Sequence, residues 1–66
     1  MHMNDYFEVR LTNGKLLSFN FECNNINYEN PNVCLFTHID KNTNKYRCLA
    51  AIPYGMIETI LSYHKD

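Results

Sequence analysis

The segment from residue 52 to residue 64 constrains the fold most, because its apolar residues have the spacing of a helix. These residues, which follow the pattern i, i+4, i+5, i+8 and i+9, are Ile52, Met56, Ile57, Ile60 and Leu61. The pattern places them on one face of an α-helix. Pro53 stands in the first turn, where its missing N–H has no helical partner to lose. We therefore predict an amphipathic helix that packs on a sheet formed by the preceding residues.

Two alternating segments near the beginning of the chain predict a β-hairpin. Residues 6–11 and 16–23 both alternate between apolar and polar side chains, which is the pattern of half-buried strands. The apolar sides are Phe7, Val9 and Leu11 in the first segment and Leu17, Phe19, Phe21 and Cys23 in the second. A turn with Asn and Gly between such segments is a strong hairpin signal.

The apolar faces also decide the register of this hairpin. A two-residue loop would place Val9 opposite Ser18, so that a polar group enters the apolar face. A loop of three residues, Thr12-Asn13-Gly14, places Val9 opposite Leu17. Because a slip of one residue turns every side chain to the other face, we predict the second register. It requires Gly14 in the left-handed region, as a bulge that closes a type I turn.

The middle of the chain predicts a loop and two further strands. Residues 24–32 carry five asparagines and a proline, and we interpret them as a loop. Residues 33–39 and 45–52 are predicted strands, joined by the polar turn 40–44. The strand at residues 33–39 is largely apolar on both faces, which indicates that both faces are covered. Since one helix covers only one face, we expect a partner or a second copy of the chain to supply a second layer.

The resulting fold prediction is α+β: a four-stranded antiparallel sheet in ββββα order with one C-terminal amphipathic helix packed on one face. The alternative is a five-stranded SH3-like or Sm-like small barrel. In that alternative Pro53-Tyr54-Gly55 forms a 3₁₀ turn and residues 57–63 form the fifth strand. Residues 1–66 are a single domain, because the chain is too short for two. We interpret Met1-His2 as an extension left by cloning, ahead of a native start at Met3.

The charge balance and hydropathy exclude several classes of function. The net charge is −1, from 6 basic and 7 acidic residues, so the chain lacks the basic excess of proteins that bind nucleic acid electrostatically. No apolar run reaches the 18 or so residues of a membrane span. The beginning of the chain has no charged and apolar regions typical of a signal peptide. We expect a cytoplasmic protein.

The residues that could carry chemistry are scattered. The cysteines Cys23, Cys34 and Cys48 include no close ligand pair such as Cys-x-x-Cys, and all fall in predicted strands, where free cysteine packs as a small hydrophobe. The seven acidic residues form no cluster, and Gly14 and Gly55 are too few for a loop that cradles phosphate. We therefore expect no enzyme activity, no catalytic residue, no cofactor and no metal.

Tyrosine is the residue type that points to a function. Five of 66 residues are tyrosines, and tyrosine is enriched at protein interfaces because it combines a large contact area with a polar tip. The predicted protein contacts are Tyr28, Tyr46, Tyr54 and Tyr63. We predict a small regulatory or inhibitor module that binds proteins and is homodimeric, with itself and an unidentified protein as partners. Accessory proteins of phages and mobile elements have this profile.

An alternative function is nucleic-acid binding by the small barrel. Its residues are Lys41, Lys45, Tyr46 and Arg47, which cluster at the turn between the third and fourth predicted strands. Basic groups bind phosphate and aromatic rings stack on bases. Asp40 dilutes this cluster, and a solvated hairpin tip that carries charge is the preferred explanation.

Overall fold

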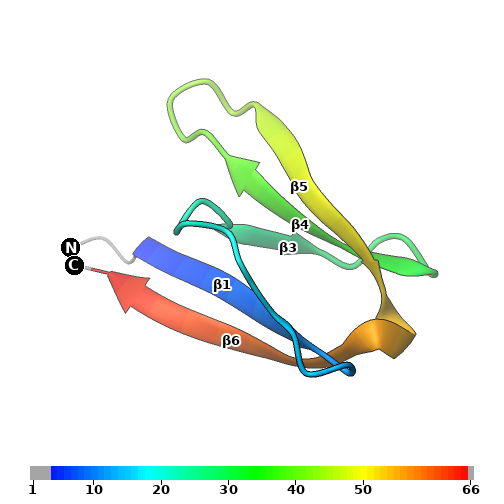
Figure 1. Cartoon of the computed structure of the whole chain (residues 1–66). Helices are drawn as coiled ribbons and strands as arrows, with labels where there is room; N and C mark the ends of the chain where they lie inside the picture. Colours follow the sequence, from blue (N-terminus) through cyan, green and yellow to red (C-terminus); the bar gives the residue numbers. More distant parts are fainter. Residues whose placement is uncertain (1–3, 66) are drawn as a thin grey trace.

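A computed structural model describes residues 4–65 of the chain as β-strands joined by turns. In chain order the elements are β1 (Asn4–Leu11), β2 (Leu16–Ser18), β3 (Asn25–Asn27), β4 (Val33–Ile39), β5 (Tyr46–Pro53), the 3₁₀ turn η1 (Tyr54–Met56) and β6 (Ile57–Lys65). The strands form two antiparallel sheets of three strands, in the orders β2-β1-β6 and β3-β4-β5. Figure 1 shows β1 beside β6, and β4 between β3 and β5. Within these residues no helix is both long and apolar enough to cross a membrane. Met1 and His2, interpreted above as an extension, lie outside the described residues.

The predicted C-terminal helix is wrong, and with it the α+β fold of four strands and one helix. Residues 57–65 form β6, which pairs antiparallel with β1 along its length. The barrel alternative required a 3₁₀ turn at residues 53–55 and a strand at residues 57–63; a 3₁₀ turn is present one residue later, at 54–56, and a strand at 57–65. That alternative counted five strands, whereas residues 4–65 form six strands in two sheets. The β-branched residues of this segment favour a strand once a partner strand is available.

A β-bulge explains why β6 has the apolar spacing of a helix. Thr59 opposes Arg10 and Ile57 opposes Leu11, so Glu58 is an extra residue on β6. Ile57 and Ile60 are three residues apart, yet the bulge turns both toward the core cluster. The i, i+3 spacing therefore arises within a strand.

The first hairpin has the predicted register. Val9 is opposite Leu17, and the N–H of Leu11 donates to the carbonyl of Lys15 over 2.8 Å. Gly14 has a φ of 89°, in the left-handed region that glycine enters without strain. The second strand is shorter than predicted, because β2 ends at Ser18 and the chain then turns.

The asparagine-rich segment is not only a loop. Its residues 25–27 form β3, which pairs with residues 35–37 of β4. The third predicted strand, residues 33–39, matches β4, and the fourth, residues 45–52, matches β5 within one residue at each end. Sequence reasoning missed β3 because asparagine disfavours strands.

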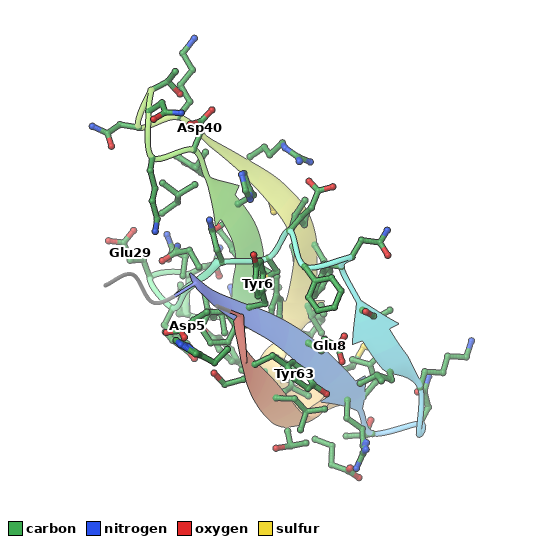
Figure 2. All side chains as sticks on the ribbon, turned by 90° about the vertical axis from the view of Figure 1, so that its left-hand side faces the viewer. Asp5, Tyr6, Glu8, Glu29, Asp40 and Tyr63 are labelled. Atoms are coloured by element: carbon green, nitrogen blue, oxygen red, sulfur yellow. The ribbon has the colours of Figure 1, made fainter. Side chains whose placement is uncertain are left out.

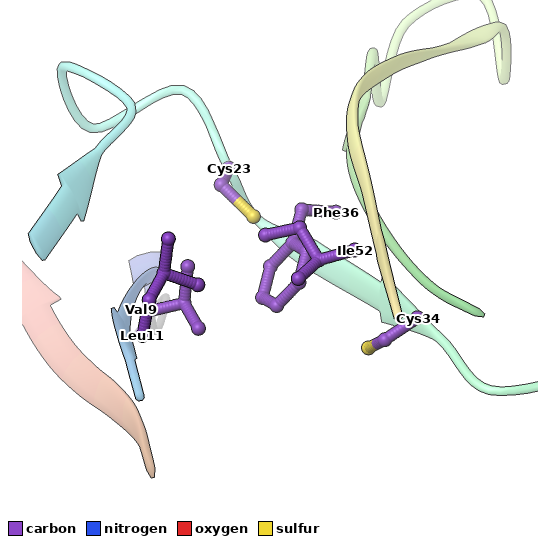
Figure 3. Packing of buried hydrophobic residues seen from close by; sticks show 6 residues of the cluster. All are labelled: Val9, Leu11, Cys23, Cys34, Phe36 and Ile52. Carbon is purple, nitrogen blue, oxygen red and sulfur yellow. The ribbon is translucent and has the colours of Figure 1, made fainter. Parts of the chain in front are cut away.

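The core lies between the two sheets. Its buried apolar residues are Val9, Leu11, Cys23, Cys34, Phe36 and Ile52 (Figure 3). Phe36 is fully buried and stacks on Phe19 with ring centroids 5.6 Å apart. Each sheet covers the inner face of the other. The second layer that we expected from a partner or another copy of the chain therefore comes from this chain itself.

Two residues between β2 and β3 join the sheets. The carbonyl of Cys23 accepts a hydrogen bond from the N–H of Phe7 in β1, over 2.9 Å. The N–H of the next residue, Asn24, donates to the carbonyl of Thr37 in β4, over 3.1 Å. The link 19–24 is thereby fixed to both sheets, and the side chains that it carries have defined positions.

Candidate recognition cleft

A cleft of about 580 Å³ opens where the beginning of β1, the link 19–24 and the end of β4 meet. We call it the recognition cleft, and it is lined by Asp5, Tyr6, Phe21, Glu22, Asn24, His38, Ile39, Asp40 and Lys41. Figure 2 shows Asp5 and Tyr6 at the beginning of β1 and Asp40 beyond the end of β4. Segments far apart in the sequence therefore contribute to one hollow.

A tight turn brings Phe21 to the surface of this cleft. Asn20 and Phe21 have φ values of 53° and 62°, and the N–H of Glu22 donates to the carbonyl of Phe19 over 2.9 Å. Positive φ at both central residues is the pattern of a type I′ turn. Asparagine tolerates this region, but a bulky residue such as phenylalanine is strained there. The turn interrupts the alternation of residues 16–23, and Phe21 is 59% exposed instead of buried.

The ring of Phe21 packs against Tyr6 of β1. The two ring centroids lie 5.4 Å apart at an interplanar angle of 80°, an edge-to-face arrangement. Such pairs contribute about 0.5–1.5 kcal/mol beyond the area that they bury. The contact fixes the position of a large apolar ring that is exposed at the surface.

His38 forms a hydrogen bond with the backbone of this turn. Its Nδ1 lies 2.6 Å from the carbonyl oxygen of Glu22. A carbonyl can only accept, so Nδ1 carries the proton and donates, and Nε2 of a neutral ring keeps its lone pair. The contact therefore fixes the orientation of the imidazole ring against the turn.

Asn24 ties the base of the cleft to β4. Its Nδ2 donates to the carbonyl of Ile39 over 3.0 Å, and its Oδ1 accepts from the N–H of Ile39 over 2.8 Å. The side-chain amide thus occupies the place that a neighbouring strand would take. This double contact makes the wall of the cleft rigid.

The charged groups around the cleft are mostly acidic. Three carboxylates, those of Asp5, Glu22 and Asp40, face one ammonium group, that of Lys41. Each carboxylate already has a partner within the chain: His64 for Asp5, Arg47 for Glu22 and the N–H of Asn42 for Asp40. The side chains of Asp5 and Glu22 are still 51% and 47% exposed. They can accept further hydrogen bonds from a cationic ligand.

The four tyrosines predicted as protein contacts are exposed but lie in three separate places. Tyr54 in η1 donates from its hydroxyl to the carbonyl of Asn30 over 2.9 Å, and this places it beside the loop that carries Tyr28. Tyr46 begins β5 and is 69% exposed. Tyr63 is on β6, opposite Tyr6. None of the four lines the recognition cleft, and their role as contacts remains a prediction.

Tyr63 has a partner on the outer face of its sheet. Figure 2 shows it next to Glu8 of β1. A hydrogen bond to the Glu8 carboxylate raises the pKa of the Tyr63 hydroxyl above its ordinary value. The contact accounts for the position of this tyrosine without an external partner.

The basic cluster predicted for nucleic acid is partly neutralised. Arg47 forms an ion pair with Glu22, and Lys41 faces the acidic cleft. Lys45 and Tyr46 line a shallower hollow beside Thr43. The cluster therefore does not form a continuous cationic surface.

Two of the three cysteines are buried in the core. Cys23 and Cys34 are fully buried, and burial raises the pKa of both thiols above the ordinary value of 9.0. A raised pKa disfavours the thiolate that nucleophilic or metal chemistry requires. Cys48 on β5 is exposed, contrary to the packing role predicted for it. Among residues 4–65 no group of three or more His, Cys, Asp or Glu side chains could hold a metal ion.

Sequence reasoning missed the aromatic part of the cleft. It assigned Phe21 to the buried side of a strand, whereas the Asn20 turn reverses its direction. The available signal was Asn20 itself, since asparagine is the residue, after glycine, that most readily adopts positive φ. Comparisons of the chain with protein-family models, with curated proteins and with solved structures gave no match.

Proposed function

We propose that this chain is a non-enzymatic protein-binding module that acts through the recognition cleft. The single observation that supports this function best is the exposed Phe21, which packs edge-to-face with Tyr6 in a strained backbone conformation. Strained residues persist only where the surrounding structure over-determines them, and they cluster at functional sites. A fixed, exposed aromatic ring beside a hollow is a typical anchor of a protein interface.

The charge around the cleft defines the chemistry of the partner segment. Asp5, Glu22 and Asp40 favour a segment that carries arginine or lysine. A cation over an aromatic ring gains about 0.5–1 kcal/mol at an exposed site, and Phe21 is an exposed aromatic residue that lines the cleft. The carboxylates supply acceptors for the N–H groups of the cation. The proposed ligand is therefore a basic segment of another protein.

A binding role fits the remaining groups better than catalysis. The buried thiols of Cys23 and Cys34 have raised pKa values, so they supply no thiolate at neutral pH. Nucleophilic catalysis needs an activated nucleophile within reach of a base. The nucleic-acid alternative receives less support. The carboxylates of the cleft would repel phosphate, and Arg47 already forms an ion pair with Glu22.

The test is an unbiased selection of random peptides displayed on phage against the immobilised protein. We expect enriched sequences to contain arginine or lysine. A synthetic peptide of the enriched sequence, titrated into isotope-labelled protein, should shift the amide signals of Phe21, Glu22 and His38. Phe21→Ala should weaken this binding at least tenfold, the loss of about 1.4 kcal/mol that an interface anchor represents.

Tyr28→Ala is the matched control. Tyr28 is 62% exposed and Phe21 59% exposed, so the two substitutions remove aromatic rings of similar accessibility. Tyr28→Ala should leave the affinity unchanged. Failure to enrich any sequence, or enriched sequences that lack basic residues, would count against the proposal. Binding that is lost with Tyr28→Ala and retained with Phe21→Ala would show that the partner contacts the tyrosines and not the recognition cleft.

A further inference from the structure

Strand β6 is a long edge strand. Its nine residues, Ile57–Lys65, pair with β1 on one side, and no described strand pairs with its other side. Figure 1 shows β6 at the outer border of its sheet. A free edge presents a row of backbone N–H and C=O groups that can pair with another strand.

The other edges of the two sheets are short or interrupted. The edge strands β2 and β3 have three residues each. The edge strand β5 is bulged at Leu49, carries Arg47 near its beginning and ends at Pro53. Short length, bulges, charge and proline are the devices by which proteins prevent pairing at an edge. From Thr59 to Tyr63, β6 has none of them.

The sequence of β6 is complementary to itself in the antiparallel direction. A two-fold axis at Leu61, the middle residue of the strand, lets the regular residues 59–63, beyond the Glu58 bulge, pair with their counterparts in a second copy. Thr59 then faces Tyr63 of the second copy, and Ile60 faces Ser62 of the second copy. No charged residues meet in this register. This register also keeps the cores of both copies on the same side of the joined sheet.

We infer that the chain forms a two-fold dimer through β6, with a second copy of itself as the partner. The joined sheet has the order β2-β1-β6-β6-β1-β2 and contains a continuous ladder across the axis. The inference is independent of the proposed function, because β6 contributes no residue to the recognition cleft. Isologous pairing closes after two copies, whereas pairing of β6 with β5 of another copy would extend to rings or filaments.

The first test is the mass in solution, measured by light scattering and by sedimentation over a range of concentrations. We expect a dimer that dissociates on dilution. Leu61→Lys places two ammonium groups at the axis and should raise the dissociation constant at least tenfold. Leu16→Lys is the matched control, since Leu16 is an exposed leucine on β2, away from β6. It should leave the dimer unchanged.

A cross-linking test examines the register and does not depend on the lysine variant being folded. In a Cys48→Ser background, Leu61→Cys places the two new thiols directly opposite each other, within reach of a disulfide after mild oxidation. Thr59→Cys should not link to itself, because two copies of this residue lie four positions apart across the axis. A mixture of Thr59→Cys and Tyr63→Cys proteins should link.

Three outcomes would overturn the inference. The first is a monomer at every concentration together with no disulfide through Leu61→Cys. The second is a dimer with the same dissociation constant in the Leu61→Lys variant, which would place the interface elsewhere. The third is a mass of more than two copies, which would indicate pairing between β6 and a different edge.

Discussion

The Nδ1 atom of His38 lies 2.6 Å from the carbonyl oxygen of Glu22, and this contact attaches the turn that carries Phe21 to the end of β4. Glu22 also forms the ion pair with Arg47 on β5. One residue of the link therefore has its backbone bound to β4 and its side chain bound to β5. The recognition cleft depends on these two contacts, because they fix the turn without a regular strand.

Removal of the His38 ring should loosen this turn. His38→Ala leaves the carbonyl of Glu22 without its donor, and we expect the free energy of unfolding to fall by about 1 kcal/mol, the net value of one hydrogen bond. His64→Ala removes an imidazole that pairs with Asp5 at the exposed end of β6, and it should cost less than about 0.5 kcal/mol. Urea denaturation of both variants measures the difference. Equal losses would show that the contact to Glu22 has no special role.

Substitution of Phe21 by glycine should change the free energy of unfolding little, although it removes the ring proposed to bind the partner. Phe21→Gly relieves the strain of a φ of 62°, worth about 1 kcal/mol or more, and it loses the edge contact with Tyr6, worth about the same. We expect the free energy of unfolding to change by less than about 1 kcal/mol. Asn20→Gly, at a φ of 53°, should change it by only a few tenths, since asparagine tolerates this region. A loss of several kcal/mol in Phe21→Gly would mean that the ring serves the core.

Truncation of Phe36 should unfold the protein. Its ring is fully buried and stacked on Phe19, and removal of a buried phenylalanine costs about 3–5 kcal/mol. A chain of this size has a total stability of roughly 3–10 kcal/mol. Phe36→Ala should therefore be largely unfolded or have a greatly lowered melting temperature by circular dichroism. Phe36→Leu, which keeps most of the volume, should remain folded with a loss of about 1–1.5 kcal/mol.

The buried thiols should make the fold sensitive to alkali. Burial raises the pKa of Cys23 and of Cys34 above 9.0, so the folded state keeps both thiols protonated where the unfolded chain ionises them. The stability that the protonated thiols give the folded state is fully present below about pH 9. It is lost as the pH rises toward their raised pKa values, by at most about 1.4 kcal/mol in the free energy of unfolding per pH unit for each thiol. Urea denaturation between pH 8 and about 10.5 measures the slope.

A variant without these thiols provides the comparison. Cys23→Ala/Cys34→Ala should be less stable at neutral pH, and its stability should depend less on pH between about 9 and 10. The hydrogen bond to Glu8 raises the pKa of Tyr63 above 10.0, so a decline that begins above pH 10 should persist in the variant. An unchanged slope between pH 9 and 10 would exclude the cysteines as its cause.

The parts of the fold that depend on residues close together in the sequence were predictable. The first hairpin is an example, because Gly14 and the alternation around Val9 and Leu17 specify the register within a few residues. Strand β6 was not predictable in the same way. Its partner β1 lies at the other end of the chain, and the bulge at Glu58 gives its apolar residues a helical spacing.

The recognition cleft was even less accessible to sequence reasoning. Phe21 continues an alternating apolar pattern, and only the left-handed turn that it shares with Asn20 exposes it. The tyrosines Tyr28, Tyr46, Tyr54 and Tyr63 are conspicuous in the sequence, but the fold separates them. Composition identified a residue type suited to contacts, whereas the position of a contact surface depends on which segments the two sheets bring together.

The pairing of β1 with β6 also bears on how fast the chain folds. Residues of β1 meet β2 after a short loop, but Asp5 and Tyr6 meet His64 and Tyr63, nearly the whole chain away. Such a high contact order slows folding, because the entropy of closing a long loop is lost before the contact forms. We therefore expect folding in milliseconds to seconds, with the hairpin of β1 and β2 available early and the β1–β6 ladder as the late step.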